Sequence, residues 1–128
     1  MLQATLPSSI TYTALIPIPL HSTKERERGF NQAERLAAFF AELFYIPINT
    51  GQLKRVRSTK TQTHLSRGQR LRNLRSAFAC SNSPFPGRFL LIDDVMTTGA
   101  TASAAAHALK KAGAQQVDVL TLARALPF

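Results

Sequence analysis

Cysteine is almost absent from this sequence, because Cys80 is the only one. A single thiol cannot close an internal disulfide, and together with the scattered histidines His21, His64 and His107 it does not make up the usual zinc ligand set. The sequence therefore excludes a disulfide scaffold and a zinc module. We expect Cys80 to fill space in the core.

Long hydrophobic runs are also missing. No apolar stretch approaches the ~20 residues that a membrane-spanning helix needs, and residues 1–10 lack the basic start and apolar stretch of a secretion signal. We therefore expect a soluble, cytoplasmic protein with no membrane insertion. Its 128 residues, 45% of them hydrophobic, suit one domain over residues 1–128, because a single core is commonly built from about 100–150 residues.

Acidic residues are scarce and unevenly placed. The chain holds 16 Lys and Arg against 7 Asp and Glu, a net charge of +9. Residues 54–75, called the basic segment below, carry half of these cations and no acid, so the remainder of the chain is close to neutral. Such a segment attracts phosphate, in nucleic acid, a small phosphorylated ligand or a membrane headgroup. A solvated basic surface is the structural alternative.

The hydrophobic pattern predicts alternating strands and helices. Apolar residues at three- and four-residue spacing indicate an amphipathic helix over 33–44, which ends before Pro47. Short strands are expected at 52–56 and 77–80, with a turn at 82–87. Within 14–20 we expect a short strand that ends in an extended exit at Pro17 and Pro19. The polar residues 57–73 have no clear period and are interpreted as a mobile loop.

The strongest pattern begins at Phe89. The apolar run 89–92 is typical of a strand buried on both faces of a parallel sheet, and it stops at Asp93 and Asp94. Residues 97–101 then open an alanine-rich helix that ends at Lys111 with Gly113 as its cap. Residues 117–123 are expected to form a further buried strand. Such βαβ sheets bind ligands beyond the carboxyl ends of their strands.

The loop before this helix has the composition of a phosphate site. A helix N-terminus offers unpaired backbone N–H groups and a partial positive charge, and Gly99 lets the backbone approach an anion closely. The hydroxyls of Thr97, Thr98 and Thr101 add hydrogen-bond donors. The structural alternative is a threonine N-cap with incidental neighbours.

Asp93 and Asp94 favour a ligand beside that loop. Two carboxylates 4 Å apart repel by about 1 kcal/mol in water and about 4 kcal/mol at an effective dielectric constant of 20. A divalent cation, two donating hydroxyls, or opposite orientation of the side chains would offset this cost. Vicinal ribose hydroxyls next to a bound phosphate would use both halves of the site. Neither the P-loop string nor the dinucleotide Gly-x-Gly-x-x-Gly fingerprint occurs.

These residues resemble a known signature. The segment LLIDDVMTTGAT at 90–101 resembles the 5-phosphoribosyl-1-pyrophosphate (PRPP) motif of type I phosphoribosyltransferases. Further stretches resemble the competence protein ComF family, which includes GntX-like proteins. They are IPIPLH at 16–21, RGFNQA at 28–33, RSTKTQ at 57–62 and LSR at 65–67. The resemblance runs from about residue 14 to the end.

The resemblance implies a type I phosphoribosyltransferase-like α/β core, with a mostly parallel sheet flanked by helices. Asp93 and Asp94 would be the catalytic acids that bind the ribose hydroxyls, directly or through Mg²⁺. The 5′-phosphate would lie against Val95, Met96, Thr97, Thr98, Gly99, Ala100 and Thr101. The pyrophosphate loop would contain His21, Arg26, Arg28 and Gly29, and a mobile basic loop would contain Lys60, Arg67, Arg70 and Arg72.

Two parts of the family pattern are not found. The N-terminal zinc ribbon and the hood that selects the acceptor base have no counterpart in the sequence, so the resemblance leaves the acceptor open. It implies a PRPP-binding, Mg²⁺-dependent phosphoribosyltransferase of the ComF type. The alternative is a non-catalytic accessory protein of DNA uptake, working with the competence machinery, whose basic loop binds single-stranded DNA. A structural subunit that has lost its ligand is a third interpretation.

Overall fold

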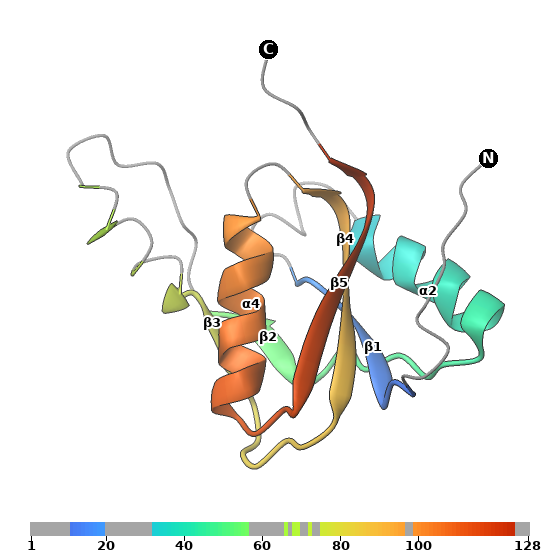
Figure 1. Cartoon of the computed structure of the whole chain (residues 1–128), viewed down its shortest axis with the longest axis horizontal. Helices are drawn as coiled ribbons and strands as arrows, with labels where there is room; N and C mark the ends of the chain where they lie inside the picture. Colours follow the sequence, from blue (N-terminus) through green and yellow to red (C-terminus); the bar gives the residue numbers. More distant parts are fainter. Residues whose placement is uncertain are drawn as a thin grey trace.

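The computed structural model describes residues 11–19, 32–56, 66, 68–69, 72, 75–96 and 99–124. Along the chain, a strand and a helix are followed by three strands, and then by a second helix and a last strand (Figure 1). They are β1 (Ala14–Pro17), α2 (Gln32–Phe44), β2 (Leu53–Arg55), β3 (Phe78–Cys80), β4 (Arg88–Met96), α4 (Ala100–Lys111) and β5 (Gln116–Arg124). The predicted α/β class, with a mostly parallel sheet flanked by helices, is confirmed.

The main sheet has the order β1-β4-β5, and both strand pairs are parallel. β4 is therefore the central strand. The outer side of β1 is covered by the chain that follows α2: Leu15 N–H donates to Pro47 O at 2.8 Å, and Asn49 N–H donates to Leu15 O at 2.9 Å. β2 and β3 form a separate antiparallel pair.

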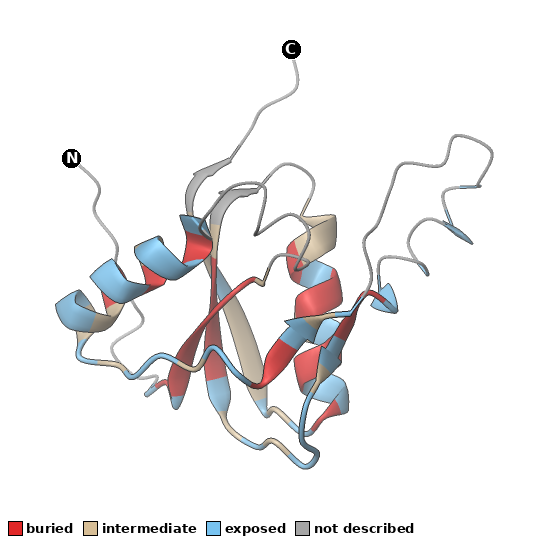
Figure 2. Cartoon of the chain, turned by 180° about the vertical axis from the view of Figure 1, so that it is seen from behind, coloured by how far each residue is buried: buried red, intermediate tan, exposed pale blue. Residues whose placement is uncertain are grey.

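Side chains of β4 alternate between two core clusters. Phe89 and Leu91 pack in the cluster that contains α4, whereas Leu90 and Ile92 pack in the cluster that contains α2. All four are at most 2% exposed. Figure 2 shows this burial along the central strand. The apolar run 89–92 was thus correctly interpreted as a strand buried on both faces, because a helix covers each face.

The two helices bury different kinds of residue. α2 buries Ala33, Ala37 and Phe40, at the predicted helical spacing. α4 faces the sheet with alanines, which let its backbone approach closely. The helix ends as predicted: Gly113 follows with φ 116°, and its N–H donates to Lys110 O at 3.0 Å. None of the described helices has the length and hydropathy that a bilayer crossing requires.

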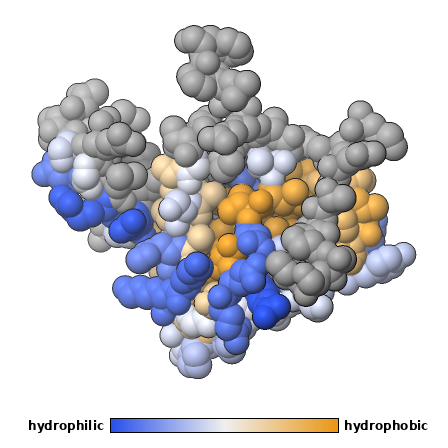
Figure 3. All heavy atoms as spheres, in the orientation of Figure 1, coloured by the Kyte–Doolittle hydropathy of each residue, from blue (hydrophilic) through white to orange (hydrophobic). Residues whose placement is uncertain are grey.

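Two strand predictions need correction. β4 does not stop at Asp93 but continues to Met96, because β5 remains paired with it as far as Arg124. The predicted strand at 117–123 exists within β5, but its described side chains are only half-buried, and Val119 is 38% exposed. β5 lies at the edge of the described sheet, which explains its exposure. In Figure 3, apolar atoms are visible in the middle of the face that β5 crosses in Figure 1.

A polar contact crosses the sheet beneath α2. The Tyr12 hydroxyl, in a side chain only 6% exposed, donates a hydrogen bond to the Asp118 carboxylate, and Gln116 Nε2 donates to the same carboxylate oxygen at 2.8 Å. Burial, the hydrogen bond and the negative charge of Asp118 together raise the pKa of Tyr12 to about 12. This contact ties the chain before β1 to the far strand.

Replacing Tyr12 by phenylalanine should lower the free energy of unfolding by about 1–3 kcal/mol at neutral pH, since Asp118 loses a donor. The folded-state pKa of Tyr12 lies above the unfolded value of 10.0. Its contribution is therefore complete below pH 10 and is lost as pH rises towards 12. Urea unfolding of wild type and Tyr12→Phe across this range measures the difference. Tyr45→Phe is the control, because Tyr45 is 94% exposed; equal alkaline losses in wild type and Tyr12→Phe would contradict the assignment.

Candidate ligand site at the carboxyl edge of the sheet

The carboxyl ends of the parallel strands meet around Asp93. β1 ends at Pro17, opposite Ile92, and the Ile18 N–H donates to Ile92 O at 2.9 Å. On the other side, Asp93 is paired in register with Thr121 of β5. Asp93 thus lies on the central strand, where β1 has ended but β4 and β5 continue. This is the edge at which parallel α/β sheets bind ligands.

Asp93 lies on the same side of the sheet as α4. It continues the alternation of Phe89 and Leu91, which pack against that helix, and it is half-buried. α4 starts at Ala100, seven residues after Asp93 in the sequence. The half-buried carboxylate and the beginning of a helix are therefore brought to one end of the sheet.

A glycine, not a threonine, caps the start of α4. Gly99 is the N-cap residue with φ 82° and ψ 0°, and no side chain among the described residues makes a capping hydrogen bond there. The Ser103 N–H makes the first helical bond, to Gly99 O at 2.8 Å. The structural alternative of a threonine N-cap is therefore wrong. A glycine cap adds no side chain of its own at the positive end of the helix, where backbone N–H groups favour an anion.

The predicted site residues are described to different extents. Asp93, Gly99, Ala100 and Thr101 are fully described, and the last three lie at the start of α4, half-buried. Asp94, Val95 and Met96 are described as backbone of β4. The remaining predicted residues lie outside the described part of the chain: Thr97, Thr98, His21, Arg26, Arg28, Gly29, Lys60, Arg67 and Arg70.

The described residues of the basic segment lie in different surroundings. Arg55 is half-buried, its guanidinium lies 5.3 Å from the centre of the Phe78 ring, and burial lowers its pKa. Arg72 and Arg75 are exposed and line a cavity of about 560 Å³ between β3 and the C-terminal half of α4, called the β3–α4 groove below. His107 and Lys111 line the same groove, and sequence analysis had not connected them with the basic segment.

This arrangement agrees with the type I phosphoribosyltransferase-like α/β core that the sequence predicted: a parallel sheet flanked by helices, with the acid-containing strand β4 at its centre. A solved structure described as the allosteric regulatory enzyme of purine biosynthesis superimposes on 89% of this chain with a TM-score of 0.55. The two sequences are 19% identical, and the match covers 22% of that chain. The likeness therefore concerns the fold.

Sequence relatives are more specific. The chain is 41% identical to competence protein F of Haemophilus influenzae over 115 residues and 38% identical to DNA utilization protein YhgH of Salmonella typhi over 113 residues. It is 35% identical to competence protein ComFC of Streptococcus pneumoniae over 109 residues. These matches cover 85–88% of this chain but 47–50% of the relatives. No family model matches.

The chain is thus a relative of competence protein F and ComFC, as its motifs indicated, and it spans about half the length of these curated relatives.

Replacing Gly99 by alanine should destabilise the protein by about 1–2 kcal/mol, because a side chain at φ 82° meets the left-handed penalty that glycine avoids. Chemical denaturation measures the change. Gly51→Ala is the matched control: Gly51 is exposed, and an added Cβ there meets nothing within 4 Å. Equal stability of the two variants would contradict a role for the Gly99 backbone conformation.

Proposed function

We propose that this chain binds PRPP at the carboxyl edge of β4 and transfers its phosphoribosyl group. The observation that supports this most is the half-buried Asp93 on the central strand, at the same end of the sheet as the glycine-capped start of α4. A phosphorylated sugar needs both features, because the helix start favours its phosphate and a carboxylate accepts hydrogen bonds from its hydroxyls.

The two halves of the site would divide the ligand between them. The loop 97–101 and the first turn of α4 would hold the 5′-phosphate, and Asp93 and Asp94 would accept hydrogen bonds from the ribose hydroxyls. The predicted pyrophosphate loop around Arg26 and Arg28 follows β1, which ends beside Ile92 at this edge. The loop would therefore leave the sheet at the edge where the ligand binds, and its arginines would contact the pyrophosphate there.

The donor set suits Mg²⁺ held jointly with the substrate. Among the described residues, no three His, Cys, Asp or Glu side chains form a cluster that could hold a metal by themselves. Mg²⁺ usually keeps several waters and is bound through one or two carboxylates together with substrate phosphates. Asp93 and Asp94 would supply those carboxylates. When bound, the ion would neutralise charge on the departing pyrophosphate.

Phosphoribosyl transfer requires little side-chain chemistry beyond this. Displacement of pyrophosphate from C1 of the ribose passes through a cationic sugar and releases a multiply charged anion. Carboxylates beside the sugar and arginines beside the leaving group stabilise both developing charges. No side-chain nucleophile takes part, because the acceptor forms the new bond to C1.

PRPP with Mg²⁺ should raise the melting temperature, because a ligand that binds the folded state alone stabilises it by about 2.7 kcal/mol at a hundredfold excess over Kd. Asp94→Asn should remove most of that shift and leave the apo protein folded. Glu42→Gln, a change of an exposed carboxylate on α2, should retain the full shift. An unchanged melting curve for wild type at millimolar PRPP would refute the proposed ligand.

A second candidate function is the handling of single-stranded DNA. It is favoured by the basic segment, which carries eight cations and no acid, and by relatives whose names refer to competence and DNA utilization. No aromatic residue occurs in the basic segment. Bases therefore have no stacking platform within it, and binding would depend on phosphate contacts without sequence preference.

This binding should depend steeply on salt. If about five cations contact phosphates, log K should fall with log[salt] at a slope of about −3.5, from roughly 0.7 ions released per contact on single strands. Replacing Arg67, Arg70 and Arg72 together by glutamine should flatten the slope by about 2. Fluorescence anisotropy with a labelled oligothymidylate measures it. A slope that is the same in wild type and triple variant would exclude these residues as phosphate contacts.

A further inference from the structure

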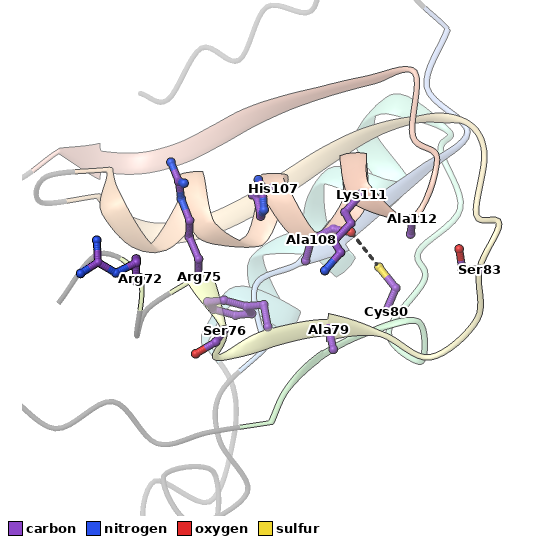
Figure 4. A pocket seen from close by; sticks show the side chains of 11 residues that line it. Arg72, Arg75, Ser76, Ala79, Cys80, Ser83, His107, Ala108, Lys111 and Ala112 are labelled. Carbon is purple, nitrogen blue, oxygen red and sulfur yellow. Dashed lines mark hydrogen bonds between the residues drawn. The ribbon is translucent and has the colours of Figure 1, made fainter. Parts of the chain in front are cut away.

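The β3–α4 groove has the size and walls of a ligand site. Its volume of about 560 Å³ lies within the roughly 300–1,000 Å³ typical of small-molecule pockets. Figure 4 shows Arg72 and Arg75 at one end, Lys111 reaching in from α4, and Ser83 at the opposite end. The groove thus has a cationic end and a cationic side.

Positive charge dominates the described lining. Arg72, Arg75 and Lys111 contribute three formal charges, His107 lies beside them, and no carboxylate is among the described residues that line the groove. All four of these side chains are exposed, so each alone would hold an anion weakly. Several cations around one cavity repel each other, and a bound anion relieves that repulsion.

The deeper wall is apolar. The buried residues of the lining are Phe78 from β3, Ala108 from α4 and Ala112, which follows α4 as its C-cap. An inorganic ion would leave this apolar surface unused. A ligand that joins a phosphate to a sugar and a planar base would place its charge against the arginines and its less polar part against this wall.

The groove is separate from the start of α4. Its α4 residues begin at His107, seven residues after the helix starts at Ala100, or about 10 Å along the helix. The groove lies at the C-terminal half of the helix, where the backbone dipole is negative. An anion here must therefore be held by side chains. Lys110 and Lys111 both lie in the last turn of α4, where a positive charge favours the helix dipole. Only Lys111 lines the groove, and the dipole alone does not explain that position.

We propose that the β3–α4 groove binds the phosphate of a nucleotide, either free or within a single strand. Where the nucleotide belongs to a strand, the proposal deepens the second candidate function by locating one of its phosphate contacts. It does not depend on PRPP binding, which involves the opposite end of α4.

Cys80 provides a direct reporter, because it lines the groove and is the only cysteine of the chain. It was expected in the core but is half-buried at its margin, where its thiol donates to Ala108 O at 3.6 Å. Burial raises the pKa of this thiol, so it should react slowly with N-ethylmaleimide. A ligand in the groove should slow the reaction further by covering the sulfur.

The experiment measures the rate of Cys80 alkylation alone, with adenosine monophosphate and with a short oligothymidylate. A ligand at ten times its Kd should slow the reaction about tenfold, in proportion to the free fraction. Arg75→Gln with Lys111→Gln should abolish this protection. The matched control, Arg88→Gln with Lys110→Gln, removes two exposed cations outside the groove and should retain it. In anisotropy titrations of the oligonucleotide, the slope of log K against log[salt] should be flatter than in wild type by about 1.4 in the groove variant, Arg75→Gln with Lys111→Gln. The control variant should keep the wild-type slope.

The outcomes separate the possibilities. Protection by both ligands or by the mononucleotide supports a nucleotide site, and protection by the oligonucleotide alone supports a site for a strand. If the oligonucleotide binds without protecting Cys80 and with equal slopes in both double variants, the groove proposal is overturned while the second candidate function stands. If neither ligand binds, both the groove proposal and the second candidate function are refuted. The melting shift with PRPP should be equal in wild type and groove variant, so failure of PRPP binding is distinguished from failure of the groove.

Discussion

The backbone pairing of β4 on both of its sides is the interaction on which the rest of this structure depends. It fixes β1 and β5 in parallel register, and the alternation of Phe89 to Ile92 assigns α4 to one face and α2 to the other. The same strand carries Asp93 to the sheet edge and leads into the Gly99 cap. A one-residue slip would exchange the two core faces and move Asp93 to the wrong side.

The sequence predicted those parts of the fold in which a local pattern coincides with burial. The four apolar residues 89–92 predicted a buried strand, the apolar spacing at 33–44 predicted α2, and Gly113 predicted the end of α4. The end of β4 was missed because hydrophobicity reports where side chains are buried, whereas backbone pairing with β5 continues to Met96. The exposure of Val119 was missed because a run of apolar residues does not show that its strand lies at an edge.

For the candidate sites, the limits were different. The acid pair and the glycine loop are contiguous, so their juxtaposition could be predicted from one segment, even though the cap proved to be Gly99 rather than a threonine. The groove could not be predicted, since Arg75 and Lys111 are far apart in the sequence and meet only because β3 packs against α4. The basic segment supplies two of the three groove cations, Arg72 and Arg75, and tertiary packing brings Lys111 to them.

The alanine face of α4 has a mechanical consequence. Ala104 and Ala105 are at most 2% exposed, and their short side chains let the α4 backbone pack closely against the core. A larger residue there would overpack this interface and displace α4 from the sheet. Because α4 begins at the Gly99 cap and carries His107 in the groove wall, such a displacement would alter both places. Substitutions of Ala104 and Ala105 would consequently have to preserve both the Gly99 cap and the groove, although neither alanine belongs to a proposed ligand site.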